Sequence, residues 1–259
     1  MAFTIGTLSF ARCGETFHIG SRERVRLILA AAEAYGPDIL LTAGHALHDR
    51  ACLNELSIGL ANTDIETTVI SEVHHDGSLR PKVLSEHALY AVHANGACQR
   101  LGRQVFAKRA ETEGQNAWRV PLFVERAHWR QLVVANRRVF VLGCGEINAV
   151  KGGLKARFID PHIAETIMSA DIILNPTHDR MGRGGLLDAK RRFLSHPLPS
   201  NKQRVYVSCS NWNLCTDSGV AQYPSATIHT CYVGGIAIAP TLAGGGAEWG
   251  FVYRQYAGI

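Results

Sequence analysis

The sequence predicts an α/β fold, a mixed β-sheet layered with helices, and three observations support this class. Segments with one apolar helical face alternate with short hydrophobic runs that are typical of buried strands. Glycine-containing turn signals lie between some of these runs, which adds antiparallel hairpins to the parallel units. No low-complexity linker interrupts the 259 residues, so we expect a single domain over residues 1–259.

The first part of the chain predicts a strand, a helix and two further strands. Residues 4–10 alternate enough to form a strand, and residues 38–45 and 67–73 are short hydrophobic runs. A helix begins at Ser21 and ends at Gly36, because apolar residues recur on one of its faces, namely Val25, Ile28, Leu29 and Ala32.

The middle of the chain predicts two hairpins and one separate strand. Asn95-Gly96 is the strongest short hairpin signal in the sequence, and Asn136 marks a second turn. The strands expected here are residues 89–92, the run that follows residue 97, residues 119–124, residues 132–135 and residues 139–142. Residues 109–116 are expected to form a polar loop.

The last part predicts two helices, two strands and a hairpin. Asp160 caps a helix that begins at Pro161, since proline is favoured at the first helical position. The other elements expected are a strand over residues 171–178, a basic helix over 186–195, a strand over 204–208 and a hairpin through Gly234-Gly235. The glycine-rich residues 242–248 lack a P-loop lysine and a following helix, so they predict a loop and no phosphate-binding site.

Two segments of the sequence resemble each other. In each, a helix is followed by Asp-Ile-x-Leu, and a histidine stands seven residues after the aspartate: Asp38 with His45, and Asp171 with His178. This similarity predicts two halves of similar plan.

Cys144 stands where a buried strand ends. Residues 139–142 are four consecutive apolar residues, and the glycines on both sides of the cysteine, Gly143 and Gly145, remove side-chain bulk around the sulfur. A substrate carbonyl can therefore approach the thiol, and the amide that follows is available as an oxyanion donor. A small buried cysteine that only fills space is the alternative interpretation.

Composition and charge narrow the class of protein. The chain is 46% hydrophobic and 19% charged, which is ordinary for a globular protein with a sizeable core. It shows neither a basic leader nor an apolar run of about 18 residues, so we expect a soluble, cytoplasmic protein without a membrane partner. The net charge of +5 is dispersed, which argues against nucleic-acid binding. Seven cysteines without a CxxC pair fit a reducing compartment.

Twelve histidines raise the question of a metal site. On a strand, the adjacent His74 and His75 would point to opposite faces, and His45 with His48 lacks the acid of an HExxH motif. Spacing along the chain therefore supports neither a metal site nor another cofactor.

Five segments, in this order and at these spacings, resemble the nitrilase or carbon–nitrogen hydrolase superfamily, and they span most of the chain. They are the helix followed by Asp38-Ile-Leu-Leu, then Val105-Phe-Ala-Lys108, Val141-Leu-Gly-Cys144-Gly-Glu146, Ala170-Asp-Ile-Ile-Leu-Asn-Pro-Thr177 and Arg204-Val-Tyr-Val-Ser-Cys-Ser-Asn211. The resemblance implies a four-layer αββα sandwich, commonly paired into dimers. It also implies a Glu-Lys-Cys triad that hydrolyses amides or nitriles through a thioester or thioimidate.

Carried over to this sequence, the resemblance assigns the nucleophile to Cys144 and the lysine of the triad to Lys108. The Lys108 ammonium and the Gly145 amide would hold the oxyanion. A free thiol is only a few per cent thiolate at neutral pH, and a neighbouring ammonium raises that fraction. The substrate would be a small amide or nitrile, and the protein a homodimer or a higher homo-oligomer.

The glutamate of that triad is missing. Relatives carry it where this chain has Gly44, which has no side chain to hold a proton. His45 is the candidate substitute, because imidazole titrates near neutral pH, and a loop histidine bonded to backbone is the alternative. An acid that orients the lysine at the substrate site is expected among Glu111, Glu113 and Glu125. Candidates to line the substrate pocket, with structural packing as the alternative, are Glu146, Asn211 and Trp212.

Two functions follow from these residues. The first is a cysteine-dependent hydrolase of a non-peptide carbon–nitrogen bond, an amidase in which a non-standard base such as His45 transfers protons. The second is a catalytically degenerate homologue that keeps the fold for binding or assembly. Loss of a general acid–base lowers a rate by on the order of 100-fold to 10,000-fold, which favours the second function. Retention of both Lys108 and Cys144 favours the first.

Overall fold

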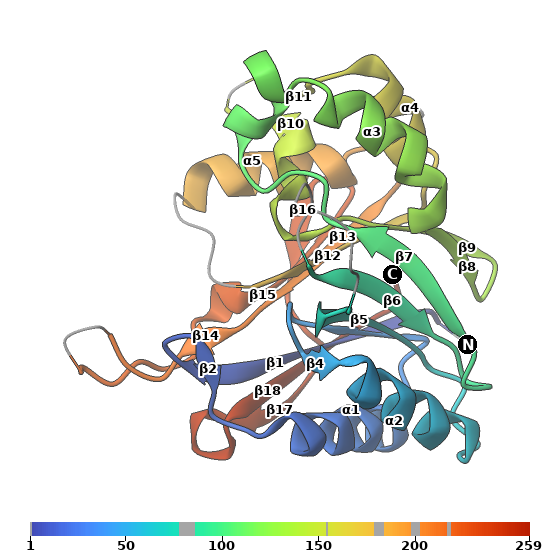
Figure 1. Ribbon diagram of the computed structural model, residues 1–259, viewed down its shortest axis with the longest axis vertical. Helices are drawn as coiled ribbons and strands as arrows, with labels where there is room; N and C mark the ends of the chain where they lie inside the picture. The colour runs from blue at the N-terminus through green and yellow to red at the C-terminus, as the bar shows by residue number, and fades with distance from the viewer. Residues whose placement is uncertain (1, 78–85, 154, 179–183, 198–202, 217–218) are drawn as a thin grey trace.

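Two β-sheets pack face to face in the computed structural model, and helices cover the outer face of each sheet (Figure 1). The structure describes residues 2–77, 86–153, 155–178, 184–197, 203–216 and 219–259. These layers form an αββα sandwich, so the fold class predicted from the sequence is confirmed. None of the helices in these ranges combines the length and the apolar character needed to cross a lipid bilayer.

The first sheet has the strand order β17-β18-β1-β3-β5-β6-β7. Its strands are β1 (Thr4–Cys13), β3 (Ile39–Thr42), β5 (Thr68–His75), β6 (Ala88–Val92), β7 (Cys98–Arg103), β17 (Leu242–Gly246) and β18 (Phe251–Ala257), with the short β2 (Thr16–Phe17), β4 (Leu47–Asp49) and β14 (Trp212–Asn213) beside them. Because β1, β3 and β5 run parallel, their carboxyl ends meet at one edge. Helices α1 (Ser21–Tyr35) and α2 (Arg50–Ala61) cover the outer face.

The second sheet has the strand order β16-β15-β13-β12-β9-β8. Its strands are β8 (Gln131–Val134), β9 (Arg137–Val141), β12 (Ile172–Thr177), β13 (Val205–Ser210), β15 (His229–Val233) and β16 (Ile236–Ile238). Here β9, β12 and β13 run parallel. The outer face carries α3 (Arg119–Arg126), α4 (Pro161–Met168) and α5 (Gly184–Ser195), with the small pair β10 (Val150–Lys151) and β11 (Arg157–Phe158) nearby.

Short 3-10 helices connect these elements. They are η1 (Arg109–Thr112), η2 (Gly114–Asn116), η3 (Ala127–Arg130), η4 (Cys144–Ala149), η5 (Ala226–Ile228) and η6 (Ala247–Trp249). Of these, η4 directly follows strand β9 and begins at the cysteine that the sequence singled out.

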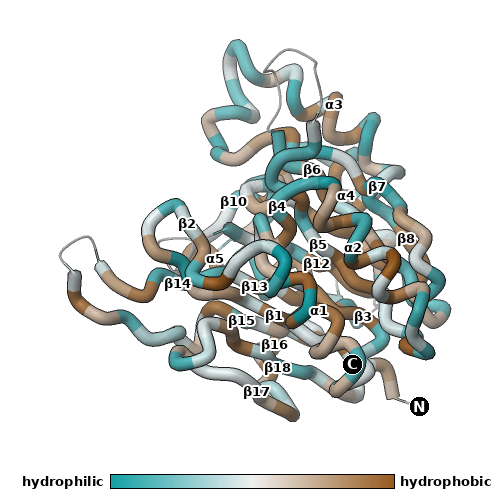
Figure 2. Tube along the Cα trace, turned by 60° about the horizontal axis from the view of Figure 1, so that its bottom comes forward, coloured by the Kyte–Doolittle hydropathy of each residue, from teal (hydrophilic) through white to brown (hydrophobic). Residues whose placement is uncertain are grey.

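The main core lies between the two sheets. Leu41 and Ile70 of the first sheet meet Val141, Leu174 and Val207 of the second, and all five are fully buried. Burial of one such side chain contributes about 1.5–3 kcal/mol, so this layer holds the sheets together. Figure 2 shows hydrophobic stretches along the strands in the interior of the molecule.

Most predicted elements are present at the expected places. The predicted helix from Ser21 is α1, and Gly36 ends it in a left-handed conformation with φ 51°. The hairpins β6–β7, β8–β9 and β15–β16 are all present. Between β8 and β9, Ala135 and Asn136 have φ of 45° and 64°, the left-handed values that a tight hairpin turn needs. Asp160 caps α4 by accepting a hydrogen bond from the His162 N–H at 2.8 Å.

Two predicted elements are wrong, and one helix is missing from the prediction. Residues 119–124 belong to helix α3, because Val120, Phe123 and Val124 recur at helical spacing and pack on the outer core. Residues 242–246 form edge strand β17, where a glycine leaves room for a neighbouring ring: a Cβ on Gly244 would lie 2.6 Å from the Tyr35 hydroxyl. Helix α2 was not predicted, although Asp49 caps it at 3.0 Å.

Candidate active site

Cys144 follows β9 and begins η4, at the carboxyl edge of the second sheet. Its side chain is partly buried, as a nucleophile that must meet substrate requires. The first N–H groups of a helix have no acceptor within the helix, and the Gly145 N–H is one of these groups in η4. A Cβ on Gly145 would overlap the main chain of Ala107, so only glycine lets that segment lie against the nucleophile loop.

His178 directly follows β12, the parallel neighbour of β9, so both chains reach the same sheet edge. The His178 backbone N–H donates a hydrogen bond to the Cys144 sulfur at 3.4 Å. The Cys144 thiol also helps to raise the pKa of the His178 imidazole. The imidazole of His178 is therefore a candidate proton carrier for the thiol.

Glu72 reaches this imidazole from strand β5 of the other sheet. Its carboxylate Oε2 lies 2.6 Å from Nε2 of His178 and accepts a hydrogen bond from the His45 backbone N–H at 3.0 Å. The side chain is fully buried. Cys144, His178 and Glu72 thus form a continuous chain of contacts across the interface of the two sheets.

The position of the missing glutamate is occupied by this pair. A Cβ on Gly44 would overlap the ring of His178 and lie 3.0 Å from Oε2 of Glu72. The Gly44 N–H also donates a hydrogen bond to the Thr177 carbonyl at 2.9 Å, which joins the ends of β3 and β12. The carboxylate absent at the end of β3 is therefore supplied by the neighbouring strand β5.

The contact between His178 and Glu72 determines the protonation state of both side chains. Burial alone would lower the pKa of His178, but the Glu72 carboxylate, which also hydrogen-bonds the ring, and the neighbouring Cys144 thiol outweigh burial and raise the pKa to about 11. Burial likewise opposes ionisation of Glu72, yet the charge of His178 brings the pKa of that carboxyl below its usual range. At neutral pH the pair is an imidazolium and a carboxylate.

His45, the predicted substitute base, lies beside this pair and not on the thiol. Its ring stacks on His178 with centroids 3.7 Å apart, and its Nε2 is 3.7 Å from Oε2 of Glu72. Burial, followed by the charge of His178, lowers the pKa of His45 far below its usual value, so this ring stays neutral. No hydrogen bond joins His45 to Cys144 in the described structure. The geometry favours His178 as the base.

Lys108 is close to the nucleophile through its main chain only. Ala107, which precedes it, packs against Gly145 and accepts a hydrogen bond from Asn148 at 3.0 Å. The Lys108 side chain is exposed, and within the described residues its ammonium makes no hydrogen bond or ion pair. Contact between the ammonium and the sulfur remains a prediction from the sequence.

The predicted acids near Lys108 do not line the site. Glu113 is exposed and forms an ion pair with Arg109 at 3.1 Å. Glu125 is exposed on α3, and its carbonyl accepts a hydrogen bond from His128. Glu111 accepts a hydrogen bond from the Ala107 N–H at 2.7 Å and so supports the segment before the lysine. The helical and 3-10 turns of this region direct the first two carboxylates into solvent.

Glu146 has a structural role instead of the predicted place in the substrate pocket. It is completely buried and pairs with the buried Arg130 at 2.8 Å. Its two oxygens also accept hydrogen bonds at 2.7 Å from the backbone N–H groups of Val105 and Gly143. Glu146 thereby ties the nucleophile loop to the segment that leads to Lys108.

Asn211 and Trp212 likewise do not lie against the Cys144 sulfur. The buried Asn211 side chain donates to the Gly44 carbonyl at 2.8 Å and accepts from the Phe10 N–H at 3.0 Å, so it holds the Gly44 loop in place. Trp212 is 6% exposed and lines a separate pocket of about 230 Å³ with Tyr223. Core packing, the alternative weighed for Trp212, fits its burial.

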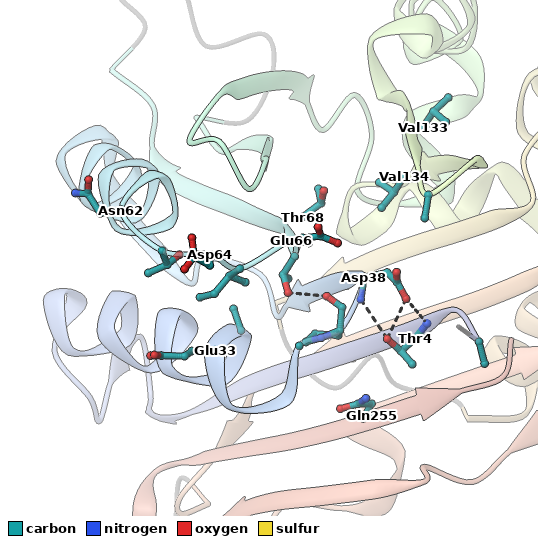
Figure 3. Close-up of a pocket in the computed structure, with 18 residues that line it drawn as sticks. Thr4, Glu33, Asp38, Asn62, Asp64, Glu66, Thr68, Val133, Val134 and Gln255 are labelled. Carbon is teal, nitrogen blue, oxygen red and sulfur yellow. Dashed lines mark hydrogen bonds between the residues drawn. The ribbon is translucent and has the colours of Figure 1, made fainter.

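A large pocket among the described residues lies at the opposite sheet edge (Figure 3). Its volume is about 960 Å³, and it is lined by the amino-terminal ends of parallel strands and the turns before them. Asp38 accepts hydrogen bonds there from the Thr4 N–H at 2.6 Å and the Thr4 hydroxyl at 3.0 Å, which joins β1 to the turn before β3. Since Cys144 stands at the carboxyl edge, this pocket is not its substrate site.

Sequence reasoning missed Glu72 and gave His178 no role. A signal for His178 was present, because it occupies the same place after Asp171 that His45 occupies after Asp38. In the structure the two histidines end corresponding strands of the two sheets and stack on each other. Glu72 had no comparable signal, since in the sequence it is a single acidic residue within a predicted strand.

Comparisons with known proteins bear on the fold. No protein-family model and no curated protein matches this sequence. Among solved structures, an amidase from Nesterenkonia sp. matches 99% of this chain and 90% of its own, with TM-score 0.57 and 13% identity. A carbon-nitrogen hydrolase from Helicobacter pylori G27 matches 98% of this chain and 88% of its own, with TM-score 0.58 and 10% identity.

A third structure has the same fold within a longer protein. A glutamine-dependent NAD(+) synthetase from Cytophaga hutchinsonii matches 99% of this chain but 43% of its own, with TM-score 0.59 and 13% identity. The nearly complete coverage of the present chain in all three comparisons shows that its described residues adopt the nitrilase-type fold.

Proposed function

We propose that this chain, which has the fold of the carbon–nitrogen hydrolases, hydrolyses a non-peptide carbon–nitrogen bond with Cys144 as nucleophile and His178–Glu72 as its proton carrier. The observation that carries the proposal is the filled space at Gly44, where a buried carboxylate and an imidazole stand beside the thiol. A nucleophile, a base in contact with it and a third group that orients the base are the parts of an activated cysteine.

Acylation would begin with the Cys144 proton on His178, whose positive charge Glu72 stabilises. The thiolate attacks the carbonyl carbon, a sulfur–carbon bond forms, and the carbonyl oxygen becomes an oxyanion near the Gly145 N–H. His178 then donates its proton to the leaving nitrogen, the carbon–nitrogen bond breaks, and an amine or ammonia departs. A thioester on Cys144 remains.

Deacylation would use the same groups in reverse. The now neutral imidazole of His178 takes a proton from water, and the hydroxide oxygen bonds to the thioester carbon. The sulfur–carbon bond breaks, the thiolate returns to its place beside the imidazolium, and a carboxylic acid is released. Proton transfer of this kind contributes on the order of 100-fold to 10,000-fold to a rate.

Lys108 has a smaller part in this proposal than the sequence resemblance implied. Its ammonium is exposed, and an exposed charge acts weakly on a partner because water screens it. We assign the proton transfers to His178 and keep Lys108 as a group that can reach the substrate carbonyl. A small amide or nitrile is the proposed substrate class.

The alternative of a catalytically degenerate homologue rested on the glycine at position 44. Glu72 and His178 supply a carboxylate and an imidazole in the same space, so the glycine no longer favours that alternative.

The test follows acyl transfer from an activated ester, because its leaving group needs no protonation. Wild-type protein mixed with p-nitrophenyl acetate is expected to release a burst of about one equivalent of p-nitrophenolate, with an acetyl adduct on Cys144 by intact mass and peptide mapping. The burst should vanish in Cys144→Ala and slow by on the order of 100-fold or more in His178→Asn. Ammonia release from a panel of small amides then identifies the substrate class.

Other cysteines provide the matched control. Cys13 and Cys98 are free and exposed, so Cys13→Ala and Cys98→Ala test whether any accessible thiol gives the burst. Both variants should behave as wild type. A burst that survives in Cys144→Ala, or equal burst rates in wild type and His178→Asn, would overturn the proposed mechanism.

A further inference from the structure

Six histidines gather at the carboxyl edge of the first sheet. Successive rings lie in contact from His178 to His45, His74, His75 and His48, with centroid separations of 3.7, 4.2, 4.1 and 5.0 Å. His87 joins this histidine cluster beside His45, at 4.0 Å. The expectation that His74 and His75 point to opposite faces is wrong, because they close the end of β5, where their rings stack. The proposed mechanism uses His178 alone.

Three members of the histidine cluster have ligand atoms close together. One nitrogen each of His45, His74 and His87 lies within 4.8 Å of the other two, and all three side chains are partly buried. Ligand nitrogens around a tetrahedral zinc ion are about 3.4 Å apart. Side-chain rotations that move the nitrogens by on the order of 1 Å would therefore bring the three histidines to zinc-binding positions. The three residues come from different segments, the loop after β3, strand β5 and the residue before β6.

Hydrogen bonding and backbone geometry prepare two of these rings. Nδ1 of His87 lies 3.0 Å from the His74 carbonyl, which only accepts, so the proton is on Nδ1 and Nε2 carries the lone pair. Metal-binding histidines usually donate their other ring N–H in this way. Nε2 of His45 is buried and has no hydrogen-bond partner. His45 also has φ 60°, a left-handed conformation that is rare outside glycine and that directs this ring into the cluster.

The burial and the charges around His45, His74 and His87 suit a bound metal cation. Burial, followed by neighbouring charges, lowers the pKa of His45 well below its usual value and that of His74 to about 4, so both are neutral ligands at pH 7. The Glu72 carboxylate stands 3.7 Å from Nε2 of His45. A pocket of about 350 Å³, lined in part by His45 and His74, opens the cluster to solvent. Arg12 lines the same pocket, and its charge is partly offset by Glu15 at 3.2 Å.

We propose that His45, His74 and His87 bind one divalent transition-metal ion, with Zn²⁺ as the reference ion. Three imidazoles with an open fourth position are a known zinc donor set, and imidazole also suits copper and nickel. Two other groups of the cluster fit less well. His48, His74 and His75 are mostly exposed, and His45, Glu72 and His178 contain a pair already joined at 2.6 Å.

The site lies next to the catalytic residues without including them. His45 contacts His178 through its ring face, so a bound ion places positive charge beside the imidazolium. Ion binding and acyl transfer are separate measurements, and either property can be present without the other.

The test is a zinc titration of tag-free protein that has been stripped of metal with a chelator. Competition against a chromophoric chelator should give one site per chain with a sub-micromolar Kd. His74→Ala and His87→Ala are each expected to weaken binding by about 100-fold, because removal of one ligand leaves an incomplete site. His48→Ala and His75→Ala, which change neighbours in the same cluster, should stay within about threefold of wild type.

Separate measurements check that the variants fold and which groups coordinate the metal. Circular dichroism checks that each variant folds, and His87→Gln is a second, milder variant at a partly buried position. Zn²⁺ should raise the Tm of wild type but not of His87→Gln. Co²⁺ in place of Zn²⁺ should give the visible absorption of a four-coordinate nitrogen site without thiolate-to-metal charge transfer.

Four outcomes overturn the proposal. They are absence of stoichiometric zinc binding, undiminished affinity in His87→Ala, loss of binding in His75→Ala instead, and a thiolate band that places Cys144 on the metal. Undiminished binding in Cys144→Ala, together with loss in His87→Ala, supports it.

Discussion

Nε2 of His178 lies 2.6 Å from Oε2 of Glu72, in space that any side chain at position 44 would have to share. The two residues come from different sheets and are 106 positions apart in the sequence. Their contact places a buried carboxylate of strand β5 beside the end of β3, next to a histidine whose backbone N–H bonds the Cys144 sulfur.

Glu72→Gln should show how much the negative charge of this carboxylate contributes to the reactivity of Cys144. Without its negative charge, burial dominates and the pKa of His178 falls from about 11 toward or below its ordinary value. We expect the acyl burst to slow by on the order of 100-fold. Alkylation by iodoacetamide should also decline most near neutral pH, where wild type keeps the imidazolium that stabilises the thiolate and the variant has lost it. Equal alkylation profiles in wild type and variant would show that the charge of Glu72 does not reach the sulfur.

Gly44→Ala should disrupt the site through one methyl group. The added Cβ overlaps the His178 ring and lies 3.1 Å from the His178 backbone nitrogen, so the imidazole must move. The burst rate is expected to fall at least about tenfold, with a loss of stability of about 1–3 kcal/mol from overpacking. Gly185→Ala is the control, since a Cβ there meets nothing within 4 Å. Wild-type kinetics in Gly44→Ala would mean that His178 can act from another rotamer.

Lys108→Ala should have a smaller effect than His178→Asn. The ammonium is exposed, so we expect less than about a tenfold fall in the burst rate, against about 100-fold or more for His178→Asn. Lys108→Arg keeps the charge and serves as the matched variant. If Lys108→Ala lowers the rate as much as His178→Asn, the lysine enters the site during turnover, as the sequence resemblance implied.

His229 should make the fold sensitive to mild acid. Its two ring nitrogens lie 2.6 Å from the Thr7 and Ser9 hydroxyls of the opposite sheet, and burial lowers the pKa of His229 to about 3. The unfolded chain then binds the proton more tightly than the folded one, so stability falls as the pH drops below about 6.5, down to about 3. Between pH 7 and pH 5 wild type should lose about 2 kcal/mol more than His229→Asn. Urea unfolding at the two pH values measures this difference, and parallel losses would refute it.

The buried pair of Arg130 and Glu146 should be needed for folding more than for chemistry. Glu146→Gln leaves the Arg130 guanidinium buried without its charge partner, which costs about 3–5 kcal/mol. Replacing both residues, as in Arg130→Met with Glu146→Leu, should recover part of that loss. Denaturant unfolding of Arg130→Met, Glu146→Leu and the double variant gives the coupling energy. A coupling near zero would show that backbone contacts alone hold the loop that begins at Cys144.

Local signals in the sequence predicted many of the elements. Turn glycines, the Asp160 cap and apolar periodicity act within a few residues, so α1, α4 and the three hairpins were recognised. The same signals misled at residues 119–124 and 242–246. Residues 119–124 form a helix whose apolar face is short enough to resemble a strand. Residues 242–246 form a strand in which glycines pair through their backbones, and a pattern of side chains does not predict such pairing.

The sequence by itself determined the layered fold and singled out Cys144 as the candidate nucleophile, because strand periodicity and the glycines around Cys144 are local properties of the chain. Only the tertiary structure decided which groups serve that nucleophile. Glu72 and His178 meet where the carboxyl ends of β5 and β12, from two different sheets, pack together at Gly44. Distances of this kind depend on how the sheets stack, and no spacing along one strand encodes them. The histidine cluster has the same origin, since His45, His74 and His87 are brought together only by strand pairing.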